Sequence, residues 1–170
     1  MGARKNRRAG QAAIEFAILY SAIILPLTFG IVYVAEMYWV WHSMVEFTRE
    51  GSRYAATHCW MGDTQNVMSY MQSHVPVNID VDQFRTGGSA QIVVQYYQRD
   101  PASGQLLPFS CDGDCSTTCV PDGVTVSVTN YEFRRFVSFV HLPPVVMPSF
   151  PTSMPIESNG CDPEQNVCNP

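Results

Sequence analysis

The stretch Arg7–Ala35, RRAGQAAIEFAILYSAIILPLTFGIVYVA, decides the fold of this 170-residue chain. One glutamate, Glu15, stands directly before the run Phe16–Ala35, which contains no charged residue. A helix of that length, about 20 residues, rises about 30 Å, which is the thickness of the hydrocarbon core of a bilayer. We therefore predict a membrane-spanning helix over residues 16–35. The position of Glu15 needs a reason, because a carboxylate beside the apolar region of a bilayer is energetically costly.

The charges of the chain are unevenly distributed. The first ten residues hold no acidic side chain and four basic ones, Arg4, Lys5, Arg7 and Arg8. The positive-inside rule then places the N-terminus in the cytoplasm and everything after about residue 40 outside. The rest of the chain is acidic, which argues against nucleic acid as a partner. A cleaved secretory signal is a weaker alternative, because its apolar region is usually about 7–15 residues and no A-x-A-like site closes this run.

Residues 11–58 are predicted to form one long helix whose second half is amphipathic. Apolar side chains recur there at intervals of three and four residues and make one apolar stripe: Met37, Val40, Trp41, Met44 and Phe47 or Thr48. An interfacial aromatic belt is expected at Tyr38, Trp39 and Trp41. Pro26 lacks a backbone N–H and crowds the carbonyl of Ala22, so we expect a kink in the span.

Residues 59–170 are predicted to form a small α+β domain outside the membrane. Four segments carry a clear signal: a helix at about 64–74, a strand over 91–99, a turn at 100–105, and an alternating strand over 124–131. Segment 133–140 fits either a strand or a helix. The proline-rich remainder is expected to be loop or extended edge.

Gly10 closes the basic leader, and four residues separate it from the pair Glu15–Phe16. This arrangement resembles the type IV pilin signal, in which cleavage after the glycine would make Gln11 the new N-terminus. The new amine would lie about 6 Å from Glu15 along the helix axis. The amine of a neighbouring subunit at 4 Å would attract Glu15 by about 4 kcal/mol at an effective dielectric constant near 20. Glu15 is thus predicted to set the stagger between subunits; the alternative is a glutamate that reaches to the cytoplasmic headgroups.

Two further segments extend the likeness, ILPLTFGI at 24–31 and EFTREGSRYAA at 46–56. With the leader they resemble the TadE-like family, which comprises minor pilins or pseudopilins of the tight-adherence (Tad/Flp) pilus. The resemblance is specific over residues 7–56, loose over 85–157 and absent at the cysteine loops. Its second part rests on five residues: Arg49, Glu50, Gly51, Arg53 and Tyr54.

The resemblance implies roles and partners. Gly10 and Gln11 would flank the cut made by a membrane prepilin peptidase, and Glu15 and Phe16 would serve processing and assembly. The implied partners are other pilins and pseudopilins, an inner-membrane assembly platform with its ATPase, and membrane lipid. The chain would be no enzyme and would need no cofactor, because the catalytic groups belong to the peptidase. It would sit in the bacterial inner membrane with its C-terminal domain in the periplasm.

Six cysteines follow the predicted span: Cys59, Cys111, Cys115, Cys119, Cys161 and Cys168. Disulfides are the preferred interpretation on the oxidising side of a membrane. Six cysteines allow fifteen connectivities, and a local bridge between Cys161 and Cys168 is the favoured pair. A zinc site is disfavoured: the C-x3-C spacing of Cys111, Cys115 and Cys119 allows one, but no second cysteine pair or histidine partner completes a ligand set.

Other chemical sites are disfavoured too. The acids around Asp112 lack the glycine that a calcium loop needs at its sixth position, which is Thr117 here. Ser138 and His141 lack a third group for a catalytic triad. The sequence therefore favours a structural role in a pilus used for adhesion and surface colonisation. The alternative is an unprocessed single-span membrane protein whose outer domain binds a ligand or partner.

Overall fold

The computed structural model describes residues 4–60, 63–111, 116–135, 143–156, 158, 160–162, 164–165 and 167–168. The chain divides into two compact units, Met1–Trp39 (unit 1) and Val40–Pro170 (unit 2). Several predictions concern residues outside the described ones: the disulfide candidate Cys115, the calcium candidate Asp112, the pair Ser138 and His141, and most of segment 133–140.

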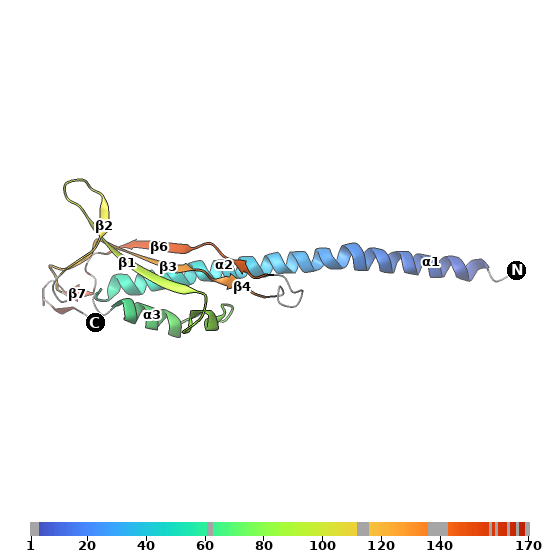
Figure 1. Ribbon diagram of the computed structural model, residues 1–170, viewed down its shortest axis with the longest axis horizontal. Helices are drawn as coiled ribbons and strands as arrows, with labels where there is room; N and C mark the ends of the chain where they lie inside the picture. Colours follow the sequence, from blue (N-terminus) through green and yellow to red (C-terminus); the bar gives the residue numbers. More distant parts are fainter. Residues whose placement is uncertain are drawn as a thin grey trace. The chain divides into compact units, whose positions relative to one another are not determined.

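A continuous helical stretch begins at Arg4 and ends at Thr57 (Figure 1). It comprises α1 (Arg4–Leu19), a π-helical turn η1 (Tyr20–Ile24) and α2 (Leu25–Thr57). The π turn ends two residues before Pro26, whose missing N–H cannot bond the carbonyl of Ala22. The N–H of Leu25 instead bonds the carbonyl of Tyr20. The predicted long N-terminal helix is thus confirmed, and a bend at Pro26 stays a prediction.

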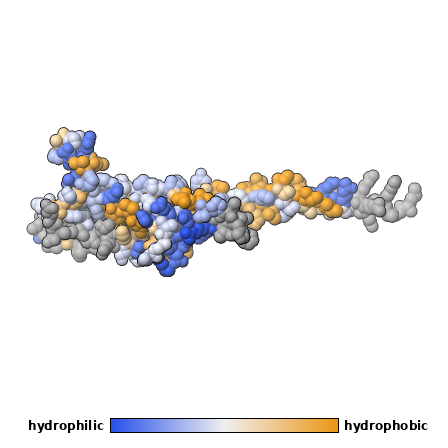
Figure 2. Space-filling model, viewed as in Figure 1, coloured by the Kyte–Doolittle hydropathy of each residue, from blue (hydrophilic) through white to orange (hydrophobic). Residues whose placement is uncertain are grey.

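Unit 1 is a single helix with apolar side chains directed outward. Phe16 is 65% exposed and Ile31 is 62% exposed. Most of the visible surface of this helix is hydrophobic in Figure 2. Among the described residues, one helical stretch, Gly10–Thr57, is long and apolar enough to cross a membrane by length and composition.

Unit 2 is built on a four-stranded antiparallel sheet. Its strands, in spatial order, are β2 (Leu106–Pro108), β1 (Gln91–Arg99), β3 (Gly123–Thr129) and β6 (Phe150–Pro155). Two small antiparallel pairs join it: β4 (Glu132–Phe133) with β5 (Val145–Val146), and β7 (Cys161–Asp162) with β8 (Val167–Cys168). The remaining elements are α3 (Asp63–Ser73) and the short 3-10 helix η2 (Val81–Phe84).

Two strands that the side-chain pattern predicts are present in the structure. The strand over 91–99 is β1, and the alternating segment is β3, with Val124, Val126 and Val128 at most 1% exposed. The expected turn at 100–105 links β1 to β2. In the proline-rich tail, β6 pairs with β3 as the edge of the sheet. An extended edge was one of the two outcomes expected there.

The second half of α2 supplies the centre of the unit 2 core. Seven of its residues are buried: Val40, Met44, Phe47, Thr48, Gly51, Ser52 and Ala55. One residue of the predicted apolar stripe, Trp41, is 41% exposed. Trp41 lies at the flank of the stripe, where its ring meets the ring of Phe150 edge-on at 4.9 Å. The buried face continues instead along the small residues toward Ala55, because those positions let neighbouring elements approach.

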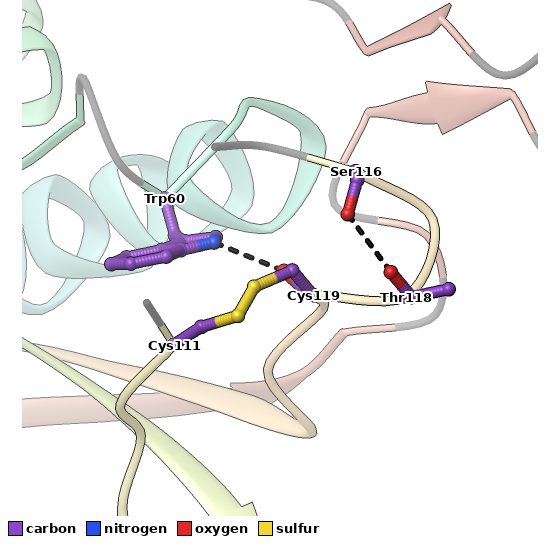
Figure 3. The surroundings of a disulfide bond; sticks show 5 residues. All are labelled: Trp60, Cys111, Ser116, Thr118 and Cys119. Atoms are coloured by element: carbon purple, nitrogen blue, oxygen red, sulfur yellow. Dashed lines mark hydrogen bonds between the residues drawn. A yellow bond between two sulfur atoms is a disulfide. The ribbon is translucent and has the colours of Figure 1, made fainter. Parts of the chain in front are cut away.

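Two disulfides close local loops in unit 2, and a further cysteine of unit 2 is also oxidised. Bonds join Cys111 to Cys119 and Cys161 to Cys168, and Cys59 is also disulfide-bonded. Trp60 lies over the first bond and donates from Nε1 to the carbonyl of Cys119 over 3.0 Å (Figure 3). The Cys111–Cys119 loop is therefore held on Trp60, in the segment that directly follows the long helix. The second bond is the local pair that the sequence analysis favoured.

Candidate processing and assembly site

The predicted processing motif lies on one exposed turn of α1. Gly10 is exposed, and a Cβ placed there would meet nothing within 4 Å. Gln11 Nε2 donates to Glu15 Oε1 over 3.1 Å, and the ring of Phe16 stacks with that of Tyr20 at 6.2 Å. Both contacts join residues four apart, which share one face of a helix. Position 11 and the Glu15 carboxylate are therefore neighbours along that face.

In this geometry the Glu15 carboxylate can accept a hydrogen bond from the Gln11 side chain or from another donor at position 11. The Gln11 amide is a neutral donor to the Glu15 carboxylate. A free amine at position 11 would be a charged donor, and the attraction between opposite charges would add to the hydrogen bond. The same exposed carboxylate is also open to a cation from a neighbouring molecule.

The segment Arg49–Tyr54, which carried the second part of the resemblance, packs α3 against α2. Gly51 is buried against Met71 of α3, and a Cβ on Gly51 would lie 2.5 Å from the Met71 sulfur. Glu50 Oε1 accepts a hydrogen bond of 2.9 Å from the hydroxyl of Tyr70. The ring of Tyr54 stacks on that of Tyr70 with centroids 4.1 Å apart and planes 8° apart. Three residues of the segment thus serve one helix–helix contact.

The neighbouring face of α2 binds the edge strand β6. Ser52 Oγ donates to the carbonyl of Thr152 over 3.0 Å, and the hydroxyls of Thr48 and Thr152 lie 2.9 Å apart. Thr48 and Ser52 are both 0% exposed. Their hydroxyls are hydrogen-bonded, as buried polar groups require. The sequence reasoning missed this contact, although two polar residues inside an apolar stripe were a visible signal.

The two arginines of the segment have surface positions. Arg49 pairs with Glu46 at 2.7 Å, and both side chains are about half exposed, at 46% and 50%. Such a surface pair is worth between zero and about 1 kcal/mol. Arg53 is exposed. The packing role of the segment therefore rests on its other residues.

Two histidines extend the Tyr54–Tyr70 stack into four rings. His58 stacks on Tyr54 at 3.8 Å, and His74 stacks on Tyr70 at 4.2 Å. Each histidine follows its tyrosine by four residues, and its Nδ1 lies 2.9 Å from that tyrosine's carbonyl. The hydrogen bond to Glu50 raises the pKa of the Tyr70 hydroxyl, because it favours the neutral phenol. The stack fixes the ends of α2 and α3 side by side.

A metal site has no support among the side chains that the structure describes. No group of three or more histidine, cysteine, aspartate or glutamate residues in that part of the chain is arranged to hold an ion.

The fold and the exposed apolar helix define a membrane-anchored protein with a disulfide-linked α+β domain. Residues 10–53 match the model of the family described as TadE-like protein, which confirms the resemblance for that segment. The match begins at Gly10, covers 44 of the 170 residues and ends within the α2 segment that packs α3. No curated protein and no solved structure matches the chain significantly. The family match points to a protein associated with the Tad pilus.

Proposed function

We propose that the chain is a minor pilin, or pseudopilin, that a prepilin peptidase cuts after Gly10 and that takes part in the assembly or initiation of Tad/Flp pili. The observation that carries the proposal is the family match, which starts at Gly10 itself. Two features support it: the motif Gly10, four residues, Glu15–Phe16, and its place on an exposed helix that leads into the candidate span. The biological role would be adhesion and surface colonisation.

The proposed topology is single-pass in the bacterial inner membrane. The basic leader would stay in the cytoplasm, in accord with the positive-inside rule, and unit 2 would lie in the periplasm. Disulfides in unit 2 fit that oxidising compartment. The proposed partners are the peptidase, the other pilins and pseudopilins of the system, the inner-membrane assembly platform and membrane lipid. The chain itself carries no catalytic role in this proposal.

Glu15 is the residue that we propose to align subunits. Before cleavage its carboxylate accepts a hydrogen bond from the Gln11 side chain. Cleavage creates an amine at Gln11, and the corresponding amine of an adjacent subunit can approach the exposed Glu15 when the two helices are staggered. A carboxylate next to lipid is costly without a cation, so the stagger that pairs the charges is favoured over others.

Mass spectrometry of the mature N-terminus tests the cleavage. We expect a start at Gln11 when the prepilin peptidase is present and a start at the leader when it is deleted. Gly10→Leu should leave only the precursor, because the peptidase requires a small residue before the cut. Gly30→Leu, which changes a glycine of the same helix away from the motif, is the matched control and should mature normally. Normal maturation of Gly10→Leu would refute the proposal.

Pilus incorporation tests the role of Glu15 separately. Glu15→Ala should insert into the membrane and be cut, yet fail to enter or initiate pili. Glu46→Ala is the control, since it removes an exposed acid of α2 that only pairs with Arg49. Pili that incorporate Glu15→Ala at the wild-type level would mean that Glu15 only reaches to the headgroups.

A further inference from the structure

The sheet of unit 2 has a core face and an opposite outer face. Val124, Val126 and Val128 of β3 lie on the core face and are at most 1% exposed. Successive residues of a strand point to opposite faces. The register of β1, β3 and β6 therefore gives the outer face eleven positions: Gln91, Val93, Gln95, Tyr97, Gly123, Thr125, Ser127, Thr129, Pro151, Ser153 and Pro155.

This outer face is polar but carries no charge. None of its eleven positions holds a charged side chain, and seven hold a hydroxyl or a carboxamide group. Its positions on β6, and Gln91 and Gln95 on β1, are exposed. Anionic ligands are bound chiefly through arginine and lysine. The outer face is therefore suited to a ligand that is polar and neutral.

One row of polar side chains crosses three strands of the outer face. Gln95 of β1 lies opposite Thr125 of β3, which lies opposite Ser153 of β6. Because neighbouring strands are about 4.8 Å apart, the row is about 10 Å long. The hydroxyls of Thr125 and Ser153 lie 2.7 Å apart and share one hydrogen. The second hydroxyl hydrogen and the remaining lone pairs are left for a ligand.

Tyr97 lies next to this row, at the neighbouring outer position of β1. Its hydroxyl donates to Gln95 Oε1 over 2.5 Å, so its ring leans along β1 toward the row. The bond uses the carboxamide oxygen of Gln95 and leaves the two N–H groups as donors. The cross-strand neighbour of Tyr97 is Gly123, which has no side chain to cover the ring. The row thus has an aromatic ring at one end.

We propose that the outer face of the sheet binds a neutral glycan, with a sugar ring on Tyr97 and sugar hydroxyls on the row Gln95–Thr125–Ser153. The C–H groups of a sugar ring carry a small positive charge, which the negative face of an aromatic ring attracts. Each sugar hydroxyl both donates and accepts a hydrogen bond, and the row offers both functions. This inference concerns unit 2 alone and does not depend on cleavage or pilus assembly, so it is tested separately from the proposed function.

Binding to a glycan array tests the proposal. The full-length protein in detergent micelles would be applied to neutral hexose and N-acetylhexosamine oligosaccharides and to their sulfated and sialylated counterparts. The dissociation constant for the retained glycan would then be measured by titration calorimetry. The variants are Tyr97→Ala, Tyr97→Phe and Gln95→Ala. Gln165→Ala, at an exposed glutamine between β7 and β8 and outside this sheet, is the matched control.

We expect retention of neutral glycans and a dissociation constant that rises about tenfold in Tyr97→Ala, as for an aromatic residue central to an interface. Gln95→Ala should bind more weakly than the wild type, and Tyr97→Phe, which keeps the ring, should bind more tightly than Tyr97→Ala. Gln165→Ala should bind as the wild type does. The substituted side chains point away from the core, and near-UV circular dichroism would check that each variant is folded.

Three results would overturn the proposal. The first is that no neutral oligosaccharide of the array is retained. The second is that sulfated or sialylated chains are retained as well as the neutral ones, since the outer face has no cation to hold them. The third is an unchanged dissociation constant in Tyr97→Ala, which would place the glycan on another surface.

Discussion

The contact between Gly51 and Met71 makes a sharp prediction about the helix pair α2–α3. In an isolated helix, Gly→Ala is stabilising by about 1 kcal/mol. At position 51, however, the new methyl would lie 2.5 Å from the sulfur and 3.1 Å from Cγ of Met71, which is 1% exposed. Forcing a methyl group into a packed core typically costs about 1–3 kcal/mol. Gly51→Ala should therefore be neutral or destabilise unit 2 by up to about 2 kcal/mol.

Truncation of the partner should reverse the sign of this effect. Met71→Ala alone should cost about 2–5 kcal/mol through the cavity that it leaves. In that background the methyl of Gly51→Ala enters free space, so the second substitution should stabilise unit 2 by about 1 kcal/mol or more. The coupling free energy of the double-mutant cycle is then about 1–3 kcal/mol, within the range measured for residues in contact.

Urea unfolding of the full-length protein in detergent micelles, followed by near-UV circular dichroism, measures all four corners of the cycle. Gly30→Ala is the control, because a Cβ at Gly30 of the same helix meets nothing within 4 Å. It should leave the unfolding midpoint of unit 2 unchanged. Additive effects of Gly51→Ala and Met71→Ala would refute the argument, since they would show that the glycine is not needed for the approach of α3.

Three further predictions follow from single contacts. Gly160→Ala should lower the urea midpoint by more than Gly104→Ala does. Both glycines have a positive φ (+74° and +70°), but only at Gly160 would the new Cβ lie against the carbonyl of Thr57. Burial raises the pKa of the Tyr131 hydroxyl above its ordinary value of 10.0. The contribution of this hydroxyl to the stability of unit 2 should therefore hold below pH 10.0 and fall as the pH rises through the folded-state pKa. Tyr131→Phe should flatten the alkaline part of a plot of the urea midpoint against pH. Trp60→Phe should cost about 1–3 kcal/mol of unfolding free energy if the Cys119 carbonyl loses its donor without gaining water, and a wild-type midpoint would contradict this.

The sequence predicted the elements whose signal is local. The uncharged run after Glu15 defines the long helix, and the alternation of Val124, Val126 and Val128 defines β3, because each pattern depends on neighbouring residues alone. The disulfide Cys161–Cys168, which closes a short loop, was favoured for the same reason.

The contacts that assemble unit 2 were not predictable in this way. The pairing of Tyr54 with Tyr70 and of Ser52 with Thr152 joins residues 16 and 100 positions apart in the sequence, with no motif to connect them. Trp41 satisfied the apolar periodicity, yet lies at the edge of the core, because periodicity identifies a face of a helix but not the width that other elements cover.

The edges of the sheet bear on how copies of this chain can associate. Ile156 donates its N–H to the carbonyl of Asp122, so the even-numbered residues of β6 bond β3 and the odd-numbered ones face outward. Two of the three outward positions, Pro151 and Pro155, have no N–H. Prolines on an edge strand prevent the addition of a further strand.

The opposite edge leads to the same conclusion. Phe109 donates to the carbonyl of Tyr96, which turns Leu106 and Pro108 of β2 outward, and Pro108 again lacks a donor. Neither edge therefore suits pairing of one sheet with another. In the part of the chain that the structure describes, the exposed apolar face of unit 1, with the Glu15 carboxylate near its N-terminal end, is the surface on which the proposed function has subunits pack. A protein that assembles through its helix, with a sheet closed to pairing, is what the proposed pilin role requires.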